Sequence, residues 1–311
     1  MDKQDYFKKL YFKQWSIGIT RGDIRSIIRS KNFRQDDIKW IYPESADRFF
    51  ADPFILNSEN GEINILYEDF SINEHYGNIS LMTLNQRFEQ VNTKVLLDTA
   101  SHLSFPFILK ENNHTYVIPE SVKSGKVSCY EYNPHSKTLT FKAELIRMPL
   151  YDPAILKIED TYWLFGSVYE NRSEYKLHIY HAGKLTGPYT QLRGNPVRSG
   201  MDGIRAAGNF IEVDGDIYRP AQNCQNEYGE SITINRIKVL DEYYFSEEPY
   251  MTIKISKKNL HENNIRTIHT MNFYGNLIVV DGIRWSFSLK EQWKNFRRNR
   301  KLLKNAETIK P

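Results

Sequence analysis

Five times along the chain, a short apolar segment is followed by a polar turn and a second segment rich in aromatic residues. In the first copy, residues 51–56 precede a turn at 58–61, and residues 63–68 follow it. An Asn-Gly or Asp-Gly pair between two such segments is typical of a β-hairpin. The other copies pair 105–109 with 116–120, 152–156 with 162–166, 208–212 with 217–220, and 270–273 with 277–280.

The spacing of these hairpins predicts an all-β fold, a five-bladed β-propeller. Equivalent positions 52, 106, 152, 208 and 270 lie 46 to 62 residues apart, which is typical of a propeller blade of about four strands. A β-sandwich or two separate β domains is the alternative. Third and fourth strands are predicted at 78–84 with 94–97, 126–132 with 139–145, 175–181 with 189–192, and 231–237 with 251–255.

The fifth copy has no outer strands of its own before the chain becomes basic. We expect residues 15–19 to pair with 284–287 and close the ring, since closure removes exposed strand edges. The chain then divides into an N-terminal lead at 1–39 that contains this strand, the propeller at 40–287, and a basic helix and tail at 288–311.

The C-terminal segment has a different pattern. A capping box at 288–291 and an apolar stripe through Leu289, Trp293, Phe296 and Leu303 predict a short basic amphipathic helix. Residues 290–311 contain eight Lys or Arg and two Glu, which is a net charge of +6. The whole chain has a net charge of +4, so the other residues together carry about −2. Such a helix either packs on the propeller or makes peripheral contact with an anionic membrane through residues 290–304.

Composition excludes several functional classes. The 311 residues are 40% hydrophobic and 26% charged, which is ordinary for a folded domain. No apolar run approaches a membrane span, and the first residues lack a signal-peptide pattern, so we expect a cytoplasmic protein, peripheral at most at the inner face of the membrane. Cys129 and Cys224 have no metal-ligand spacing. We expect no metal, no cofactor and no nucleic-acid partner.

A propeller gathers the inner ends of its blades around one axis, so equivalent positions of the copies should meet there. Many of these positions are acids, histidines, arginines or amides, which are costly to bury unless they are paired. We therefore expect a functional cavity on the axis. The candidate catalytic residues are Asp52, Glu120, Asp152 and His269. The candidate substrate-binding residues are Glu68, His102, Ser104, Arg205, Arg219, Gln222, Asn272 and Asp281.

Several motifs follow one another in the order found in a known propeller family. They are Phe50-Ala51-Asp52-Pro53-Phe54, Tyr67-Glu68, His102-Leu103-Ser104-Phe105-Pro106, Ile118-Pro119-Glu120-Ser121, Asp152-Pro153, Trp163-Leu164-Phe165, Gly187-Pro188-Tyr189, Asn195-Pro196-Val197, Arg205-Ala206-Ala207-Gly208, Tyr218-Arg219-Pro220-Ala221-Gln222, Tyr228-Gly229 and His269-Thr270-Met271-Asn272. From about residue 40 to 282 the chain resembles the N-terminal domain of plant glucosamine inositolphosphorylceramide transferases and its bacterial relatives. The resemblance implies a propeller that handles glycans.

A more distant resemblance is to glycoside hydrolase family 43. It rests on Ala51-Asp52-Pro53-Phe54 and Tyr151-Asp152-Pro153, and it implies a base at Asp52 and a tuning carboxylate at Asp152. That family carries its acid, a glutamate, in the fourth blade, where this chain has Arg205-Ala206-Ala207-Gly208. Since glycoside hydrolysis needs one protonated and one ionised carboxyl, Glu120 or Glu68 would have to supply the acid from another blade.

The arginines point to sugar transfer. Arg205 and Arg219 have forked donors that match the phosphate of a nucleotide-sugar or lipid-phosphate donor. Asp52, Glu120 or His269 would then accept the proton of the acceptor hydroxyl. The sequence therefore favours a glycosyltransferase-like enzyme acting on carbohydrate or nucleotide-sugar substrates in the assembly of a cell-surface polysaccharide or glycolipid.

Two other functions remain open, and each candidate residue also has a structural explanation. The chain is alternatively a glycoside hydrolase using Asp52, Asp152 and Glu120, or a glycan-binding module without catalysis. An aspartate before proline often caps a turn, and Glu68 has potential ion-pair partners in Arg205 and Arg219. Histidines and amides at the axis also satisfy strand ends.

The basic tail generates the first prediction. Deleting residues 290–311 removes a net charge of +6, so binding to anionic vesicles at low salt should weaken, as measured by co-sedimentation. Neutral vesicles serve as the control. Unchanged binding to anionic vesicles would assign the segment to packing.

Overall fold

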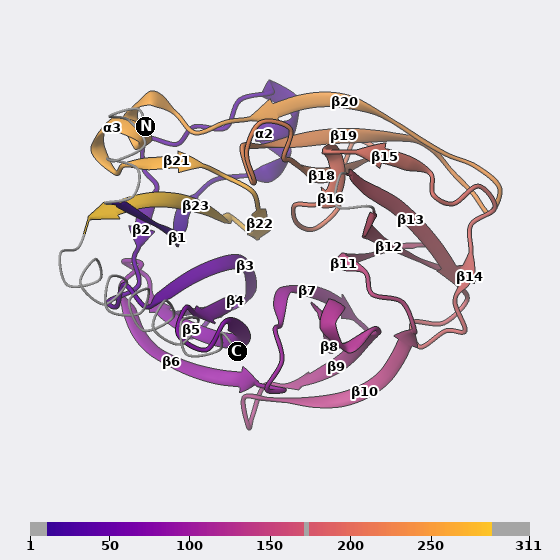
Figure 1. Ribbon diagram of the computed structural model, residues 1–311, viewed down its shortest axis with the longest axis horizontal. Helices are drawn as coiled ribbons and strands as arrows, with labels where there is room; N and C mark the ends of the chain where they lie inside the picture. The colour runs from indigo at the N-terminus through magenta and orange to yellow at the C-terminus, as the bar shows by residue number, and fades with distance from the viewer. Residues whose placement is uncertain (1–10, 171–173, 288–311) are drawn as a thin grey trace, which may run out of the picture.

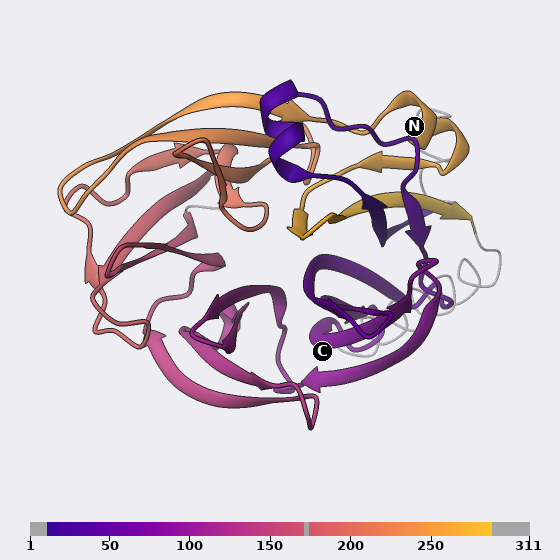
Figure 2. The same ribbon diagram turned by 180° about the vertical axis from the view of Figure 1, so that it is seen from behind.

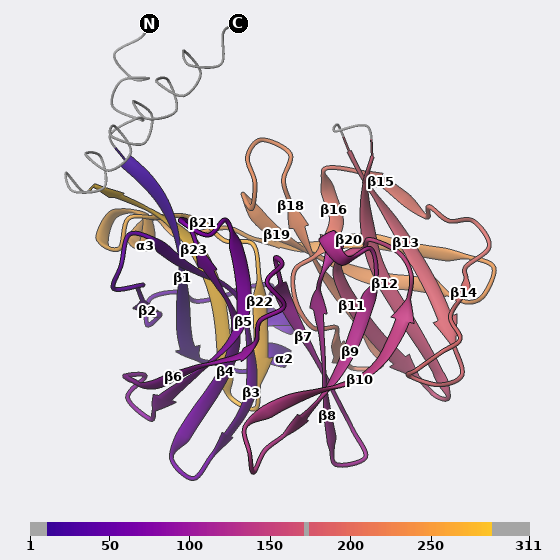
Figure 3. The ribbon, with the colours of Figure 1, turned by 60° about the horizontal axis from the view of Figure 1, so that its bottom comes forward.

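Five antiparallel sheets surround one axis in the computed structural model of the chain (Figures 1 and 2). The structure describes residues 11–170 and 174–287. The first copy's inner strand and its counterparts lie nearest the centre, and Figure 3 shows the same sheets from a tilted direction. The predicted five-bladed propeller is confirmed. The predicted basic helix at 288–311 lies outside the described residues.

The first three blades follow one another along the chain. Blade 1 contains β3 (Arg48–Glu59), β4 (Glu62–Ser71), β5 (Tyr76–Asn85) and β6 (Gln90–Leu97). Blade 2 contains β7 (Ser104–Glu111), β8 (His114–Glu120), β9 (Val127–Asn133) and β10 (Thr138–Ile146). Blade 3 contains β11 (Tyr151–Ile158), β12 (Thr161–Glu170), β13 (Glu174–Ala182), β14 (Thr190–Gln191) and β15 (Arg198–Gly200).

The inner strands of the last two blades are each interrupted. Blade 4 contains β16 (Asp202–Ala206), β17 (Ile211–Val213), β18 (Asp216–Asn223), β19 (Ser231–Leu240) and β20 (Phe245–Ile253). Blade 5 contains β21 (Ile265–Thr267), β22 (Met271–Tyr274) and β23 (Leu277–Phe287), completed by β1 (Tyr11–Arg21) and β2 (Lys39–Ile41). The predicted inner segments 208–212 and 270–273 correspond to β17 and β22. Each is preceded by a further short strand, β16 or β21, which pairs with the same partner, β18 or β23.

The N-terminal strand closes the ring, as predicted, but with a different register. β1 pairs with β23 over eleven residues, and Trp15 faces Ile283 while Ile19 faces Val279. Residues 284–287 therefore lie opposite 11–14 rather than 15–19. The longer overlap places Ile17 and Ile19 in the same buried cluster as Val279, and burial of these apolar side chains selects the register.

In all five copies a two-residue loop joins the inner strand to the next strand of the hairpin. The closing pairs are Glu59 with Glu62, Glu111 with His114, Ile158 with Thr161, Val213 with Asp216, and Tyr274 with Leu277. Each loop contains a residue with positive φ, such as Asn60 at 54° and Gly61 at 80°. This is the backbone that tight hairpins require, so the loops confirm the repeat.

A proline bulge recurs in the inner strands of blades 1 to 3. Asp52, Phe105 and Asp152 each precede a proline and have φ of 51°, 42° and 46°. The strand register shifts at each of these sites. Proline cannot donate to the ladder, and a bulge redirects the neighbouring side chain. The same proline bulge therefore bends the inner strand of each of these three blades near the axis.

The core lies between neighbouring sheets. Phe54 of blade 1 contacts Phe105 and Phe107 of blade 2, with ring centroids 5.1 and 6.0 Å apart. The helix α2 (Ile24–Ser30), capped by Asp23, packs its buried isoleucines into the cluster of blades 4 and 5. Two further helical segments are η1 (Val122–Ser124) and α3 (Lys257–Glu262). No helix among the described residues is long and apolar enough to cross a membrane.

Gly208 occupies the break between β16 and β17, where blade 4 meets blade 5. Its φ is 147°, and a Cβ added there would lie 2.1 Å from the Met271 carbonyl oxygen. We predict that Gly208→Ala lowers the free energy of unfolding by roughly 2–6 kcal/mol through backbone strain and overpacking. Urea denaturation measures this. Gly183→Ala, where no atom lies within 4 Å of the added Cβ, should change little, and equal stability of both variants would contradict the prediction.

Candidate active site

Residues from all five blades line a cavity of about 310 Å³ on the axis. This volume is at the lower end for small-molecule sites. Seven predicted site residues line it: Asp52, Glu68, His102, Ser104, Glu120, Arg205 and His269. The aromatic residues of the lining are Trp15, Phe49, Phe70, Tyr151 and Tyr228. The cavity thus combines carboxyl groups with aromatic walls.

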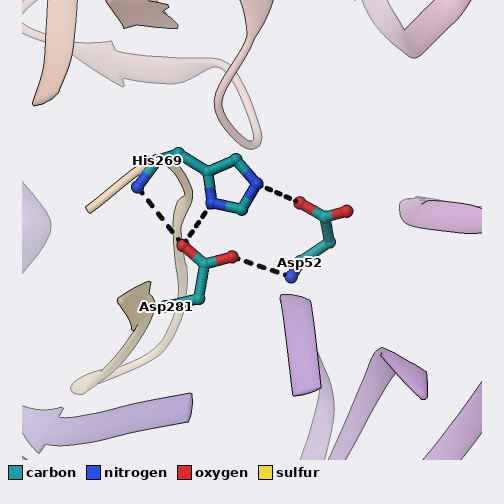
Figure 4. Close-up of side chains that lie close together, drawn as sticks. All are labelled: Asp52, His269 and Asp281. Carbon is teal, nitrogen blue, oxygen red and sulfur yellow. Dashed lines mark hydrogen bonds and ion pairs between the residues drawn. The ribbon is translucent and has the colours of Figure 1, made fainter. Parts of the chain in front are cut away.

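His269 lies between two aspartates, as Figure 4 shows. Its Nδ1 is 2.7 Å from Asp281 Oδ1, and its Nε2 is 3.4 Å from Asp52 Oδ1. Asp281 also accepts backbone N–H groups of Asp52, His269 and Thr270 at 2.9, 3.3 and 2.9 Å. Asp52 Oδ2 accepts the N–H of Phe105 at 3.2 Å, whereas Asp52 Oδ1 is buried and has no hydrogen-bond partner among the described residues.

The environment shifts the proton affinities of this group. Burial raises the pKa of Asp52 to about 7, while His269 opposes and Asp281 adds to the rise. Burial alone would lower the pKa of His269, but the charges of Asp281 and Asp52 and the hydrogen bond to Asp281 raise it. Asp52 therefore changes its charge near neutral pH, beside a histidine that favours its charged form.

Asp52, His269 and Asp281 each offer a ligand atom within 4.8 Å of the others, a spacing that metal sites also use. Both oxygens of Asp281 already accept N–H groups. Its remaining capacity for a cation is small. The geometry therefore favours a hydrogen-bonded relay of the three side chains.

Asp152 lies behind the cavity wall and holds Arg205. The guanidinium Nε and Nη2 lie 2.6 and 2.9 Å from the two carboxylate oxygens, and Gln222 Nε2 donates to Asp152 Oδ2 at 3.1 Å. Glu120 lines the cavity, accepts the N–H of Asp152 at 3.1 Å and lies 3.6 Å from Arg205. The charge of Arg205 is thus compensated by protein carboxylates, which weakens its expected role as a phosphate ligand.

Four predicted binding residues lie outside the cavity lining, namely Arg219, Gln222, Asn272 and Asp281. The Arg219 guanidinium binds Glu247 of β20, with Nε 2.8 Å from Oε2, and the carbonyls of Gly203 and Ile204. This places Arg219 inside blade 4, where a buried cation needs a buried anion. Asn272 donates to the carbonyl of Pro53 at 2.8 Å and accepts the N–H of Asn209 at 2.8 Å, so it joins blades 1, 4 and 5.

Sequence reasoning missed the aromatic residues of the site. Trp15 stacks on His269 with centroids 4.0 Å apart, and Tyr228 lies 5.4 Å from the same ring. Tyr228 also accepts a hydrogen bond from Arg205 Nη1 at 3.2 Å. Trp15 reaches the axis through ring closure, so its role depends on pairing between the two ends of the propeller.

The family profile of the glucosamine inositolphosphorylceramide transferase 1 N-terminal domain matches residues 41–278. The chain belongs to this family. The matched residues run from the end of β2 into β23 and include every predicted site residue except Asp281. The family resemblance seen in the sequence is therefore confirmed.

Glucosamine inositolphosphorylceramide transferases from two plants are similar to this family member. The protein of Oryza sativa subsp. japonica is 28% identical over 255 residues, covering 78% of this chain and 34% of the rice protein. The protein of Arabidopsis thaliana is 27% identical over 302 residues, covering 87% and 39%. The chain thus spans a little over a third of the length of these relatives.

Solved structures share the fold of this family member. A family 117 glycoside hydrolase of Zobellia galactanivorans has a TM-score of 0.53 at 13% identity, covering 80% of this chain and 77% of that one. An exo-β-1,3-galactanase of Phanerochaete chrysosporium has a TM-score of 0.51 at 12% identity, covering 70% and 58%. At these identities the similarity concerns the fold alone.

The raised pKa of Asp52 generates a prediction about stability. Between about pH 4 and 7 the folded chain retains a proton that the unfolded chain has lost, so this group makes the unfolding free energy fall by about 1.4 kcal/mol per pH unit as pH rises. Asp52→Asn removes that contribution, and its stability should fall less steeply in urea denaturation at pH 5, 6 and 7. The exposed Asp160→Asn should follow the wild type, and parallel curves for all three would refute the assignment.

Proposed function

We propose that the chain is a glycan-active transferase whose axial cavity binds an acceptor sugar, with Asp52 accepting the proton of its hydroxyl group. The observation that carries the proposal is Asp52, a residue of the cavity lining whose buried Oδ1 accepts no hydrogen bond from the described residues and lies 3.4 Å from His269 Nε2. A buried acceptor of this kind is costly unless a ligand supplies the donor. The names of the plant relatives support sugar transfer.

The surroundings of Asp52 suit a general base. A pKa of about 7 lets it exist in both protonation states near neutral pH, which is where proton transfer is most effective. His269 lies 3.4 Å from Asp52 Oδ1 and is oriented by Asp281. As Asp52 gains the hydroxyl proton, the freed oxygen forms a bond to the anomeric carbon of the donor sugar, and the bond from that carbon to the leaving group breaks.

The walls suit a neutral, hydroxyl-rich ligand. Trp15, Phe49 and Phe70 present aromatic surface, and an aromatic face packs well against the C–H groups of a sugar ring. Arg205 is already compensated by Asp152. Besides Arg205, the lining contains one further Lys or Arg side chain among the described residues, Lys123, against the three carboxyl groups of Asp52, Glu68 and Glu120. The cavity therefore favours a sugar over an anion.

Hydrolysis is the second candidate, because water can replace the acceptor sugar. Burial and the charge of Asp152 raise the pKa of Glu120, against the effect of Arg205. A carboxyl that keeps its proton can protonate a glycosidic oxygen. In this reading Asp52 is the base, Glu120 the acid, and Asp152 positions Arg205.

The cellular setting is also part of the proposal. The relatives' names contain inositolphosphorylceramide, which supports a role in the assembly of glycolipid or surface polysaccharide. The net charge of +6 in residues 290–311 is compatible with a cytoplasmic protein that contacts an anionic membrane face.

The test is transfer by Asp52→Asn with nucleotide sugars and oligosaccharides as donors and sugars as acceptors. We expect the rate to fall by roughly 10²–10⁴-fold because a positioned general base is lost, while circular dichroism shows a folded protein. Asp160→Asn serves as the control. Product released to water alone would favour hydrolysis, sugar binding without turnover would favour a binding module, and full activity of Asp52→Asn would remove Asp52 from the mechanism.

A further inference from the structure

Glu68 is a second carboxyl group of the cavity, on the strand next to the one that carries Asp52. It lies in β4, where it pairs with Ala51 of β3. The proline bulge shifts the register immediately after Ala51, so both acids turn toward the axis from one blade. The Glu68 side chain is only 7% exposed, and it lines the cavity.

The contacts of Glu68 are unusual for a buried carboxylate. Among the described residues, no hydrogen-bond donor reaches it, and it forms no ion pair with Arg205 or Arg219. His102 lies beside it, with Nδ1 3.7 Å from Glu68 Oε1, and carries no positive charge at neutral pH. That Nδ1 accepts the N–H of Gly77 at 3.0 Å. Two acceptors therefore lie near each other, so His102 offers no donor through Nδ1 that would stabilise the ionised form of Glu68.

The backbone leaves room for this arrangement at Gly77. A Cβ added to Gly77 would lie 2.6 Å from Glu68 Oε1 and 2.8 Å from the carbonyl oxygen of Leu103. Only glycine allows the carboxyl group to pack directly on the neighbouring strand while the same residue donates to His102. The position of Glu68 is thus built by three elements of blades 1 and 2.

The charges around Glu68 also favour its neutral form. Burial raises its pKa well above the ordinary range, and Asp52, Glu120, Asp281 and Asp152 add to the rise. Burial lowers the pKa of His102 to about 4, with Lys123 and Arg205 contributing, so this histidine supplies no positive charge at neutral pH.

Glu120 is less suited to release a proton. It accepts the N–H of Asp152 and lies 3.6 Å from the Arg205 guanidinium, so its carboxyl group is held in the framework between blades 2 and 3. Glu68, in contrast, accepts no backbone N–H group and forms no ion pair with an arginine among the described residues. The difference in hydrogen bonding separates the two glutamates.

We propose that Glu68 is the proton donor of the cavity and that the sugar donor releases a sugar or alkyl alcohol rather than a phosphate. This rests on the proposed function, in which Asp52 is the base. A phosphate leaves as an anion without protonation and calls for free cations, whereas an alkoxide leaving group needs a proton.

The step balances through these two carboxyl groups. The acceptor hydroxyl gives its proton to the ionised Asp52 and forms a bond to the anomeric carbon. The bond from that carbon to the leaving oxygen breaks, and this oxygen takes the proton of Glu68. Asp52 ends the step protonated and Glu68 ends it ionised, so transfer of one proton from Asp52 to Glu68 through solvent restores the site, and no oxidant or further reactant is needed.

The kinetic test compares two kinds of donor with Glu68→Gln. Methyl glycosides and disaccharides need a proton on the leaving oxygen, whereas 2,4-dinitrophenyl glycosides do not. We expect a loss of roughly 10²–10⁴-fold on the first kind and little change on the second. Glu62→Gln, at the exposed end of the same strand, is the matched control. Equal loss on both kinds, or no loss on either, would overturn the proposal.

An infrared measurement separates this proposal from the proposed function. At pH 7 the wild type and Glu62→Gln should show the carbonyl stretch of a neutral carboxylic acid, and Glu68→Gln should lose intensity in that band. Identical bands in all three proteins would contradict the assignment of a proton to Glu68, even if the protein transfers sugar. Absence of turnover of any donor by the wild type, with the band present, would instead refute the transferase.

Discussion

The structure depends on buried carboxylates that accept backbone N–H groups across the joints between blades. Asp281 of blade 5 accepts the N–H of Asp52 in blade 1, and Asp52 accepts that of Phe105 in blade 2. Glu120 of blade 2 accepts the N–H of Asp152 in blade 3. The proline bulges expose these N–H groups toward the axis, and a buried N–H without a partner is costly. The same carboxylates therefore satisfy the inner strands and line or support the cavity.

Because some carboxylates are needed to bind backbone N–H groups, the acids differ in how free they are to bind a ligand or exchange a proton. Both oxygens of Asp281 accept N–H groups and Asp281 orients His269, whereas Asp52 Oδ1 accepts no hydrogen bond from the described residues and lies 3.4 Å from His269 Nε2. Asp152 is committed to Arg205. Crowding of so many acids in a dry centre raises proton affinities, as in enzymes that run acid and base chemistry in one pocket. The chemistry of the site is thus a consequence of how the blades are joined.

The family relationship and the fold similarity bear on different questions. The match over residues 41–278 concerns one domain, and the plant relatives extend well beyond it. The propeller is shared with glycoside hydrolases at 12–13% identity, but one fold hosts many chemistries. The chemistry of this chain must therefore be argued from local features: an arginine in blade 4 that is neutralised by Asp152, and a glutamate in blade 1 that faces a neutral histidine.

The repeated hairpins and the proline motifs were enough to predict five blades, the axial cavity and most of its polar lining, because turn chemistry and alternating apolar positions are local properties. Pairing between Trp15 and Ile283, the capture of Arg219 by Glu247, and the place of Tyr228 were beyond reach of the sequence. These contacts depend on which residues meet across the closed ring, and the sequence offers several chemically equivalent partners for each of them. Local pattern determined the fold and the residue types at its centre, and only tertiary packing decided which of them are paired and which are left to bind a ligand.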